Sequence, residues 1–205
     1  MRIIGGTAAG TLLKAPKGFE LRPTPDLVRQ AVFNSLAPRL AGAAVLELFA
    51  GTGALSLECL SRGAAQALCV EQSSRHARFI RRNLELARLQ NNLLDMWVRD
   101  AFASLALLAQ TGRQFDLIFA DPPYGGKNLG RRSTSDAQQL LDNADLPKLL
   151  SPAGLFILGH AKRDTLTLPA CWHETKTLKH GDSWMRFLSA TRAPEATKLA
   201  MQNHC

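Results

Sequence analysis

The chain has 205 residues, 46% of them hydrophobic, and is therefore long enough to bury the core of one well-filled domain. Its 25 basic residues outnumber 17 acidic residues, and the formal net charge of +8 favours a polyanionic partner, although charge can also serve solubility alone. No run of about 18 apolar residues is present, so no membrane partner is expected. Cys59, Cys69, Cys171 and Cys205 are scattered, which argues against a metal site or disulfides and fits a reducing cytoplasm.

The first 23 residues differ in pattern from the rest of the chain. Short β segments joined by glycines predict a small β-hairpin extension over residues 1–23, with basic side chains at Arg2, Lys14, Lys17 and Arg22. From Thr24 the spacing of apolar residues becomes helical, with Thr24 as the expected cap, a proline at the first helical position and Pro38 near the end. A second unit is therefore predicted over residues 24–190.

Strands and helices alternate through this second unit. Strands are predicted at residues 43–49, 66–71, 94–100, 115–121 and 154–160, followed by a β hairpin at 173–179 and 184–190. Helices are predicted at residues 54–62, 74–89, 102–110 and 135–150, the last interrupted near Pro147. This alternation indicates an α/β fold with a mainly parallel, doubly wound sheet of seven strands. Residues 191–205 are polar and are expected to form a flexible tail.

The segment ELFAGTGALSLE, residues 47–58, follows a predicted strand and opens a helix. Gly51 and Gly53 allow the backbone to approach a ligand closely, but Ser56 stands where a dinucleotide fingerprint needs a third glycine. Glu47 before the turn would repel a pyrophosphate. The acid suits a ligand that carries an ammonium group and no phosphate, and S-adenosylmethionine is such a ligand.

Two further acids close neighbouring predicted strands. Glu71 lies 18 residues after Gly53, where a carboxylate can accept from both ribose hydroxyls, and Asp100 could accept from the adenine amine. Either acid alone could simply end a strand or cap a helix. Together with Glu47 and the glycine turn they predict a cofactor edge, to which we also assign Phe49 and Ala101.

The segment DPPY, residues 121–124, ends the fourth predicted strand at the same edge. Pro123 forces Pro122 into an extended backbone, so the Pro122 carbonyl has a fixed direction. Asp121 and this carbonyl could accept the two hydrogens of an exocyclic base amine, and Tyr124 could stack on the base. A simple turn is the alternative for the proline pair. We predict Asp121, Pro122 and Tyr124 as catalytic residues.

Several blocks along the chain resemble the bacterial RsmD family. They are MRIIGGTAAGTLLKAPKG, RPTPDLVRQAVFNSL, ELFAGTGALSLECLSRGA, VEQSSRHARFIRRNL and DPPY, in this order. The resemblance extends to about residue 188, and the N-terminal block is its most family-specific part. The segment KHGDSWMRFL departs from the family, because His180 and Ser183 stand where a YGxT pattern usually has tyrosine and threonine.

The resemblance implies a Rossmann-like, class I S-adenosylmethionine-dependent methyltransferase. Its expected reaction is methylation of the N2 amine of guanine 966 in 16S ribosomal RNA, on free rRNA or on a partly assembled small subunit. Arg2, Lys14, Lys17, Arg22 and Thr24 are the predicted RNA contacts, although Arg22 or Thr24 could instead approach the methionine end of the cofactor. A sheet that only caps the domain is the alternative for this N-terminal block.

Two other functions stay open at this point. A DNA adenine-N6 methyltransferase would share DPPY, but the chain has no apparent helix-turn-helix or separate DNA-recognition domain. A non-catalytic RNA-binding assembly factor would not need Glu47, Glu71, Asp100 and Asp121 together. Arg81 and Arg82 fall on a predicted helix, where a solvated face is the simpler interpretation.

Overall fold

The computed structural model describes residues 1–16, 25–124, 126 and 131–191. Within these residues the strands form a seven-stranded sheet in the order β3-β2-β1-β4-β5-β7-β6. The first five strands of the chain pair in parallel, while β7 is antiparallel to both β5 and β6. The predicted α/β fold with its C-terminal hairpin is thus confirmed.

The strands are β1 Ala44–Leu48, β2 Gln66–Glu71, β3 Leu94–Val98, β4 Phe115–Ala120, β5 Leu150–Ala161, β6 Trp172–His180 and β7 Ser183–Ala190. The α-helices are α1 Asp26–Leu36, α2 Ala54–Ser61, α3 Ser74–Leu86, α4 Ala101–Thr111 and α5 Asp136–Asp142. Three short 3-10 helices complete the described elements, namely η1 Ala37–Arg39, η2 Asn91–Leu93 and η3 Leu146–Leu149.

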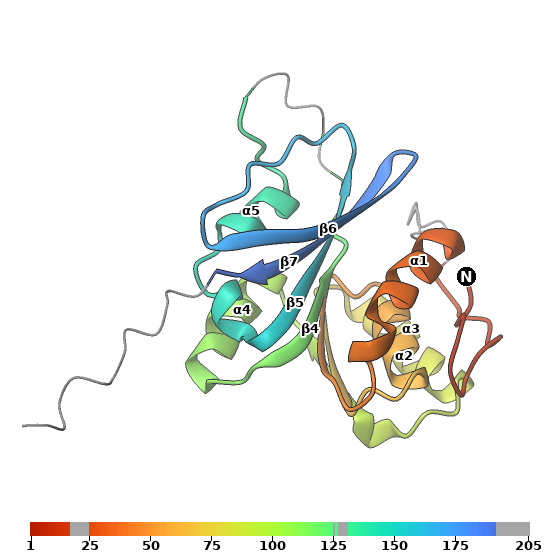
Figure 1. Cartoon of the computed structure of the whole chain (residues 1–205). Helices are drawn as coiled ribbons and strands as arrows, with labels where there is room; N and C mark the ends of the chain where they lie inside the picture. Colours follow the sequence, from red (N-terminus) through yellow and green to blue (C-terminus); the bar gives the residue numbers. More distant parts are fainter. Residues whose placement is uncertain (17–24, 125, 127–130, 192–205) are drawn as a thin grey trace, which may run out of the picture.

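The helices cover both faces of the sheet (Figure 1). On one face, the apolar side chains of α1, α2 and α3 join those of residues 1–16 in one core, which includes Ile3 and Phe33. On the other face, α4, α5 and η3 form a second core around Phe115 and Phe156. Because the central strands are buried from both sides, their sequences are nearly continuous apolar runs.

The region between β4 and β5 differs from the prediction of one interrupted helix. Helix α5 ends at Asp142, and the Asn143 side-chain oxygen accepts from the amides of Asp145 and Leu146, each at 3.0 Å. Pro147 then lies in η3, and β5 begins at Leu150, four residues earlier than predicted. The asparagine competes with the helix for backbone amides, and the proline prevents it from resuming.

The start of the chain also differs from the prediction. Residues 1–16 contain one isolated antiparallel bridge, between Arg2 and Leu12, in place of the continuous strands of a hairpin. Helix α1 has Pro25 at its N-cap, without a side-chain cap, whereas the sequence predicted Thr24 there. Thr24, Lys17 and Arg22 lie outside the described residues, as do residues 192–205 of the predicted tail.

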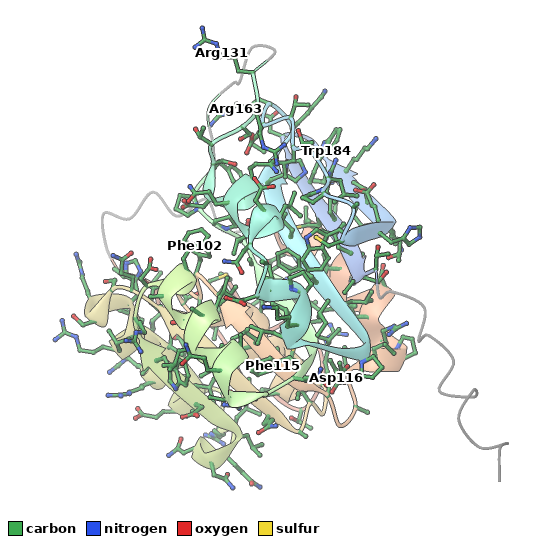
Figure 2. All side chains as sticks on the ribbon, turned by 90° about the vertical axis from the view of Figure 1, so that its left-hand side faces the viewer. Phe102, Phe115, Asp116, Arg131, Arg163 and Trp184 are labelled. Carbon is green, nitrogen blue, oxygen red and sulfur yellow. The ribbon has the colours of Figure 1, made fainter. Side chains whose placement is uncertain are left out.

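The strand register brings the predicted site residues to one edge of the sheet. Leu48 pairs with Val70 and with Ala120, so the turns after β1, β2 and β4 begin side by side. Figure 2 shows Phe115, at the start of β4, near one end of the molecule, and Trp184, which pairs with the end of β5, near the opposite end. This second end carries the site described next.

Candidate active site

The turn after β1 is a strained segment. Phe49 has a φ of 55°, a left-handed conformation that is rare for a bulky residue, and its ring lies edge-on to Phe102 at 6.0 Å between centroids. Gly53 has a φ of 73° at the N-cap of α2, and an added Cβ there would lie 2.9 Å from Ile80 Cγ2. The turn therefore requires glycine at position 53. The same turn places Phe49 beside Phe102 of α4.

Glu47 supports this turn from inside the fold. It is 4% exposed, and its carboxylate accepts hydrogen bonds from the backbone amides of Leu55, at 3.3 Å, and Ser56, at 2.8 Å. Burial raises the pKa of Glu47 to about 7, although the hydrogen bonds from Ser56 and Leu55 act in the opposite direction. The sequence did not predict this contact with the α2 N-terminus; an ammonium partner for Glu47 stays a prediction.

Glu71 joins the glycine turn to the start of α3. Its carboxylate accepts from the Gly51 amide and from the Ser73 amide, each at 2.8 Å, and it is 8% exposed. The Nδ1 atom of His76 lies 3.3 Å from the same carboxylate. Glu71 is therefore fixed at the end of β2, as predicted, and the glycine turn is fixed with it.

Asp100 occupies the N-cap of α4 and does not close a strand. Strand β3 ends at Val98, and the Asp100 side chain accepts from the Ala103 amide at 2.8 Å. Ala101, the first residue of α4, is buried. Asp100 thus makes the contact of the helix-capping alternative. It lies two residues after β3 and is therefore still at the same edge of the sheet.

Asp121 directly follows β4 and lies against β5. A Cβ added to Gly159 would be 2.3 Å from Asp121 Oδ1 and 3.2 Å from Met185 Sδ. Gly159 therefore provides the space in which the Asp121 carboxylate sits. The sequence offered no signal for this role of Gly159, because it depends on how β4 and β5 are paired.

Tyr124 is tied to the β6–β7 hairpin. Its hydroxyl lies 2.8 Å from the Ser183 hydroxyl, and either group can donate. The preceding Pro122 is buried, whereas Pro123 is exposed. Ser183 is one of the two positions that depart from the family pattern, and it retains the hydroxyl of the usual threonine. The structure thus brings Asp121, Pro122 and Tyr124 to the end of β4 and adds Ser183 to them.

The N-terminal segment is held on α2 by buried polar side chains. Both carboxylate oxygens of Glu58 accept backbone amides, from Ile4 at 2.6 Å and Gly5 at 2.8 Å. The Ser61 hydroxyl accepts from the Ala8 amide at 2.9 Å. These contacts fix the segment to α2, while the segment folds back on itself around the Arg2–Leu12 bridge, where the amides of Ile3 and Leu13 donate to the carbonyls of Thr11 and Met1.

The two described basic residues of this segment lie at its surface. Arg2 is exposed and lies 3.7 Å from the Asp26 carboxylate. Lys14 is exposed, while its amide donates to the Asn83 side chain at 2.7 Å and its carbonyl accepts from it at 2.9 Å. Asn83 also donates to the Thr52 carbonyl at 3.0 Å. The segment is thereby linked to the glycine turn, a connection that the sequence did not indicate.

Two kinds of feature are absent from the described residues. No group of three or more histidine, cysteine, aspartate or glutamate side chains there is arranged to hold a metal ion. In the same part of the chain, no helix has the length and apolarity needed to cross a membrane.

The family model described as "Conserved hypothetical protein 95" matches residues 1–189. The chain belongs to this family, which is the RsmD family. It is 35% identical over 172 residues to "Ribosomal RNA small subunit methyltransferase D" of Escherichia coli (strain K12), covering 84% of this chain and 81% of that protein. It is 32% identical over 160 residues to "Putative rRNA methyltransferase YlbH" of Bacillus subtilis (strain 168), covering 78% and 82%.

A solved structure agrees with this assignment. "Putative methyltransferase yhhF from Escherichia coli" matches with a TM-score of 0.76 and 28% identity, covering 94% of this chain and 99% of that one. The fold of this family member is accordingly the Rossmann-like fold of S-adenosylmethionine-dependent methyltransferases.

Proposed function

We propose that this RsmD family member transfers a methyl group from S-adenosylmethionine to the N2 amine of a guanine in 16S rRNA, of the guanine 966 type. The observation that carries the proposal is Asp121 beside Tyr124 at the end of β4, next to the glycine turn of β1. The name of the Escherichia coli relative supports a small-subunit rRNA substrate. The net charge of +8 also suits RNA.

The residues at the ends of β1, β2 and β3 fit the proposed methyl donor. Glu71 lies where the two ribose hydroxyls could reach its carboxylate, and Asp100 lies where the adenine amine could reach it. Phe49, at the strained turn, and Ala101 would line the space between these acids. When bound, S-adenosylmethionine supplies an electrophilic methyl group on a positively charged sulfur.

The Asp121 carboxylate and the Pro122 carbonyl accept the two hydrogens of the guanine N2 amine in this mechanism. The amine lone pair is delocalised into the ring, so the nitrogen is a poor nucleophile until both hydrogens are directed. Tyr124 stacks on the base and fixes its plane. Alignment of the reacting atoms then supplies most of the rate. The nitrogen would gain the methyl group as the sulfur–methyl bond of the donor breaks and leaves a neutral thioether, and it would lose one proton, which Asp121 or water accepts.

The two alternative functions are less well supported. A DNA adenine-N6 methyltransferase could use the same DPPY segment, residues 121–124. The names of both relatives, however, refer to rRNA methyltransferases. A non-catalytic assembly factor would have no use for a glycine at position 159, where a side chain would displace Asp121. Whether the substrate is free rRNA or a partly assembled subunit is a question for the assay.

Tritiated methyl transfer tests the proposal directly. The protein is incubated with labelled S-adenosylmethionine and with undermodified small ribosomal subunits, naked 16S rRNA or plasmid DNA in parallel. We expect label in rRNA, recovered as N2-methylguanosine after digestion. Label in DNA as N6-methyladenine would contradict the proposal, and so would RNA binding without methyl transfer to any of the three substrates.

A further inference from the structure

One helix and the two residues after it carry half of the net charge of the chain. Residues 74–88, which include α3, contain five arginines, one glutamate and no lysine, a formal net charge of +4 out of +8. The five are Arg75, Arg78, Arg81, Arg82 and Arg88, and all of them are exposed. We call this set the α3 arginine face. The proposed mechanism uses none of its members.

The arginines lie on one side of the helix. At 3.6 residues per turn, the four positions within α3 fall within an arc of about 120°, and Arg88 follows the end of the helix with a φ of 52°. The buried residues of α3, which include Ile80 and Leu84, lie on the remaining side and pack into the domain. In Figure 1, α3 lies beside α2 on the same side of the sheet. The charged side is therefore directed to solvent along the length of the helix.

Acidic side chains do little to neutralise this face. In the part of the chain that the structure describes, no carboxylate oxygen lies within 4.0 Å of the guanidinium nitrogens of Arg78, Arg81, Arg82 or Arg88. Glu85 is the one acid on the helix. By contrast, Arg62, Arg132 and Arg186 elsewhere on the chain each pair with a carboxylate. The charge of these four arginines thus remains available to a partner.

The position of the helix connects this face to the proposed site. Helix α3 begins at Ser74, next to Ser73, whose amide donates to the Glu71 carboxylate. Farther along, Asn83 holds Lys14, so an exposed N-terminal cation lies next to the helix. With 13 residues, α3 extends about 20 Å from the edge of the sheet. A polyanion bound along it would reach the catalytic edge.

We infer that the α3 arginine face binds the phosphate backbone of the substrate RNA outside the active site. This inference rests on the proposed function for the identity of the RNA. Guanidinium groups bind phosphate oxygens in a planar, two-pronged geometry, and the exclusive use of arginine on this helix favours phosphate over a general solubility role. An acidic protein is the less favoured partner, because the core of a protein interface is usually apolar.

The test compares two triple variants that each remove three positive charges. The surface variant carries Arg78→Ala, Arg81→Ala and Arg82→Ala. The matched control carries Arg39→Ala, Arg113→Ala and Lys148→Ala, at the opposite edge of the sheet near the starts of β4 and β5. Affinity for a 16S rRNA fragment is measured by fluorescence anisotropy over a range of salt concentrations. Calorimetry with S-adenosylmethionine and thermal unfolding check that each variant is folded.

The expected result is a difference in the salt dependence of binding. Affinity falls as salt rises, and loss of three phosphate contacts should make the plot of log affinity against log salt less steep by about 2 to 3. Binding at low salt should weaken about tenfold or more. The control variant should change the slope by less than about 1. Equal losses in the two variants would overturn the inference, because bulk charge would explain them. An unchanged slope in the surface variant would also overturn it and leave an acidic protein as the partner.

Methyl transfer by the wild-type protein separates this inference from the proposed function. Absence of rRNA methylation by a protein that shows the expected difference in slopes would reject the proposed function alone. Efficient rRNA methylation by a protein whose surface variant binds RNA normally would reject the inference alone.

Discussion

The site edge of the sheet is built in two different ways. One part, at the ends of β1, β2 and β3, is the proposed cofactor site, which we call the cofactor half. There, Glu47, Glu71 and Asp100 each accept backbone amides that lie no more than 20 residues away in the sequence. The other part, at the ends of β4 and β5, carries the proposed catalytic residues, and we call it the catalytic half. There, Tyr124 bonds to Ser183, 59 residues away, and Asp121 occupies space that the missing side chain of Gly159 leaves open.

The difference teaches that the two halves should fail in different ways. Backbone amides hold the acids of the cofactor half, so changes there should alter folding and cofactor affinity. Long-range contacts position the groups of the catalytic half, so changes there should alter turnover at nearly constant affinity. Substitutions in each half test this separation, and Asp121 is expected to be the most sensitive position.

Asp121→Ala should have the largest effect. Loss of a preorganised acceptor for the amine should lower single-turnover methyl transfer about a hundredfold to a thousandfold. Asp121→Asn should be milder, because its amide oxygen still accepts a hydrogen bond. Calorimetry with S-adenosylmethionine and RNA binding serve as controls, and a large loss of cofactor affinity in Asp121→Ala would break the separation.

Glu47→Gln should change how stability depends on pH. The folded-state pKa of about 7 lies above the usual value of 4.5, so the protonated form is favoured in the folded chain. Its stabilising contribution is complete below pH 4.5 and is lost as the pH rises through 7, a loss on the order of 3 kcal/mol. Urea unfolding from pH 4 to 8 should therefore show a decline in wild type that is flatter in Glu47→Gln. Identical profiles would contradict this expectation.

Gly159→Ala should act on turnover through Asp121. The new Cβ would overlap Asp121 Oδ1, and a displacement of about 1 Å in a catalytic group can lower the rate up to about a hundredfold. Gly112→Ala is the matched control, because its Cβ would meet nothing within 4 Å and its positive φ causes only local strain. Normal turnover in Gly159→Ala would show that the space beside Asp121 is not required.

Glu71→Ala should weaken S-adenosylmethionine binding by about 1–3 kcal/mol, the usual scale for hydrogen bonds to a charged group. The substitution also removes the acceptor of the Gly51 and Ser73 amides, so part of the loss should come from the turn itself. Glu71→Gln retains an acceptor and should lose less. Calorimetry in the presence of a chelator measures both variants, and unchanged affinity would place the cofactor elsewhere.

Ser183→Ala should have the smallest effect. Loss of one neutral hydrogen bond is worth about 0.5–1.5 kcal/mol, or about twofold to tenfold in turnover. Tyr124→Phe should cost a similar amount, since its ring still stacks. Ser183→Thr keeps the hydroxyl and should therefore keep the wild-type rate, in contrast to Ser183→Ala. A double-mutant cycle of Tyr124→Phe and Ser183→Ala should show coupling, and additive effects would mean that the bond does not position the ring.

The sequence predicted the fold and the place of Glu71 at the end of β2 because both signals are local. Apolar runs bounded by glycines defined the buried strands, and the acid at the end of β2 was predicted at Glu71. The direction of a carboxylate is harder to predict, since Glu47 contacts the start of α2 and Asp100 caps α4. Local competition also produced the one wrong helix, where Asn143 and Pro147 divide residues 135–150 into α5 and η3.

The sequence could predict that residues 121–124 follow β4, but not which residues hold them there. Asp121, Pro122 and Tyr124 form one short motif, whereas Ser183 and Gly159 reach it only through the pairing of β5 with β4 and β7. Residues 1–16 were predicted as a hairpin because alternating residues resemble strands. The buried Glu58 and Ser61, which accept the amides of Ile4, Gly5 and Ala8, lie more than 50 residues away, so the sequence did not indicate these contacts.

The side chain of Asn83 has a consequence for which amino acids its position tolerates. A carboxamide offers two hydrogens, and both are donated here, to the carbonyls of Lys14 and Thr52, while its oxygen accepts the Lys14 amide. Aspartate has nearly the same shape but no hydrogens to donate when ionised, and leucine has neither function. The identity of this fully buried residue is therefore dictated by the stoichiometry of donors and acceptors, not by volume.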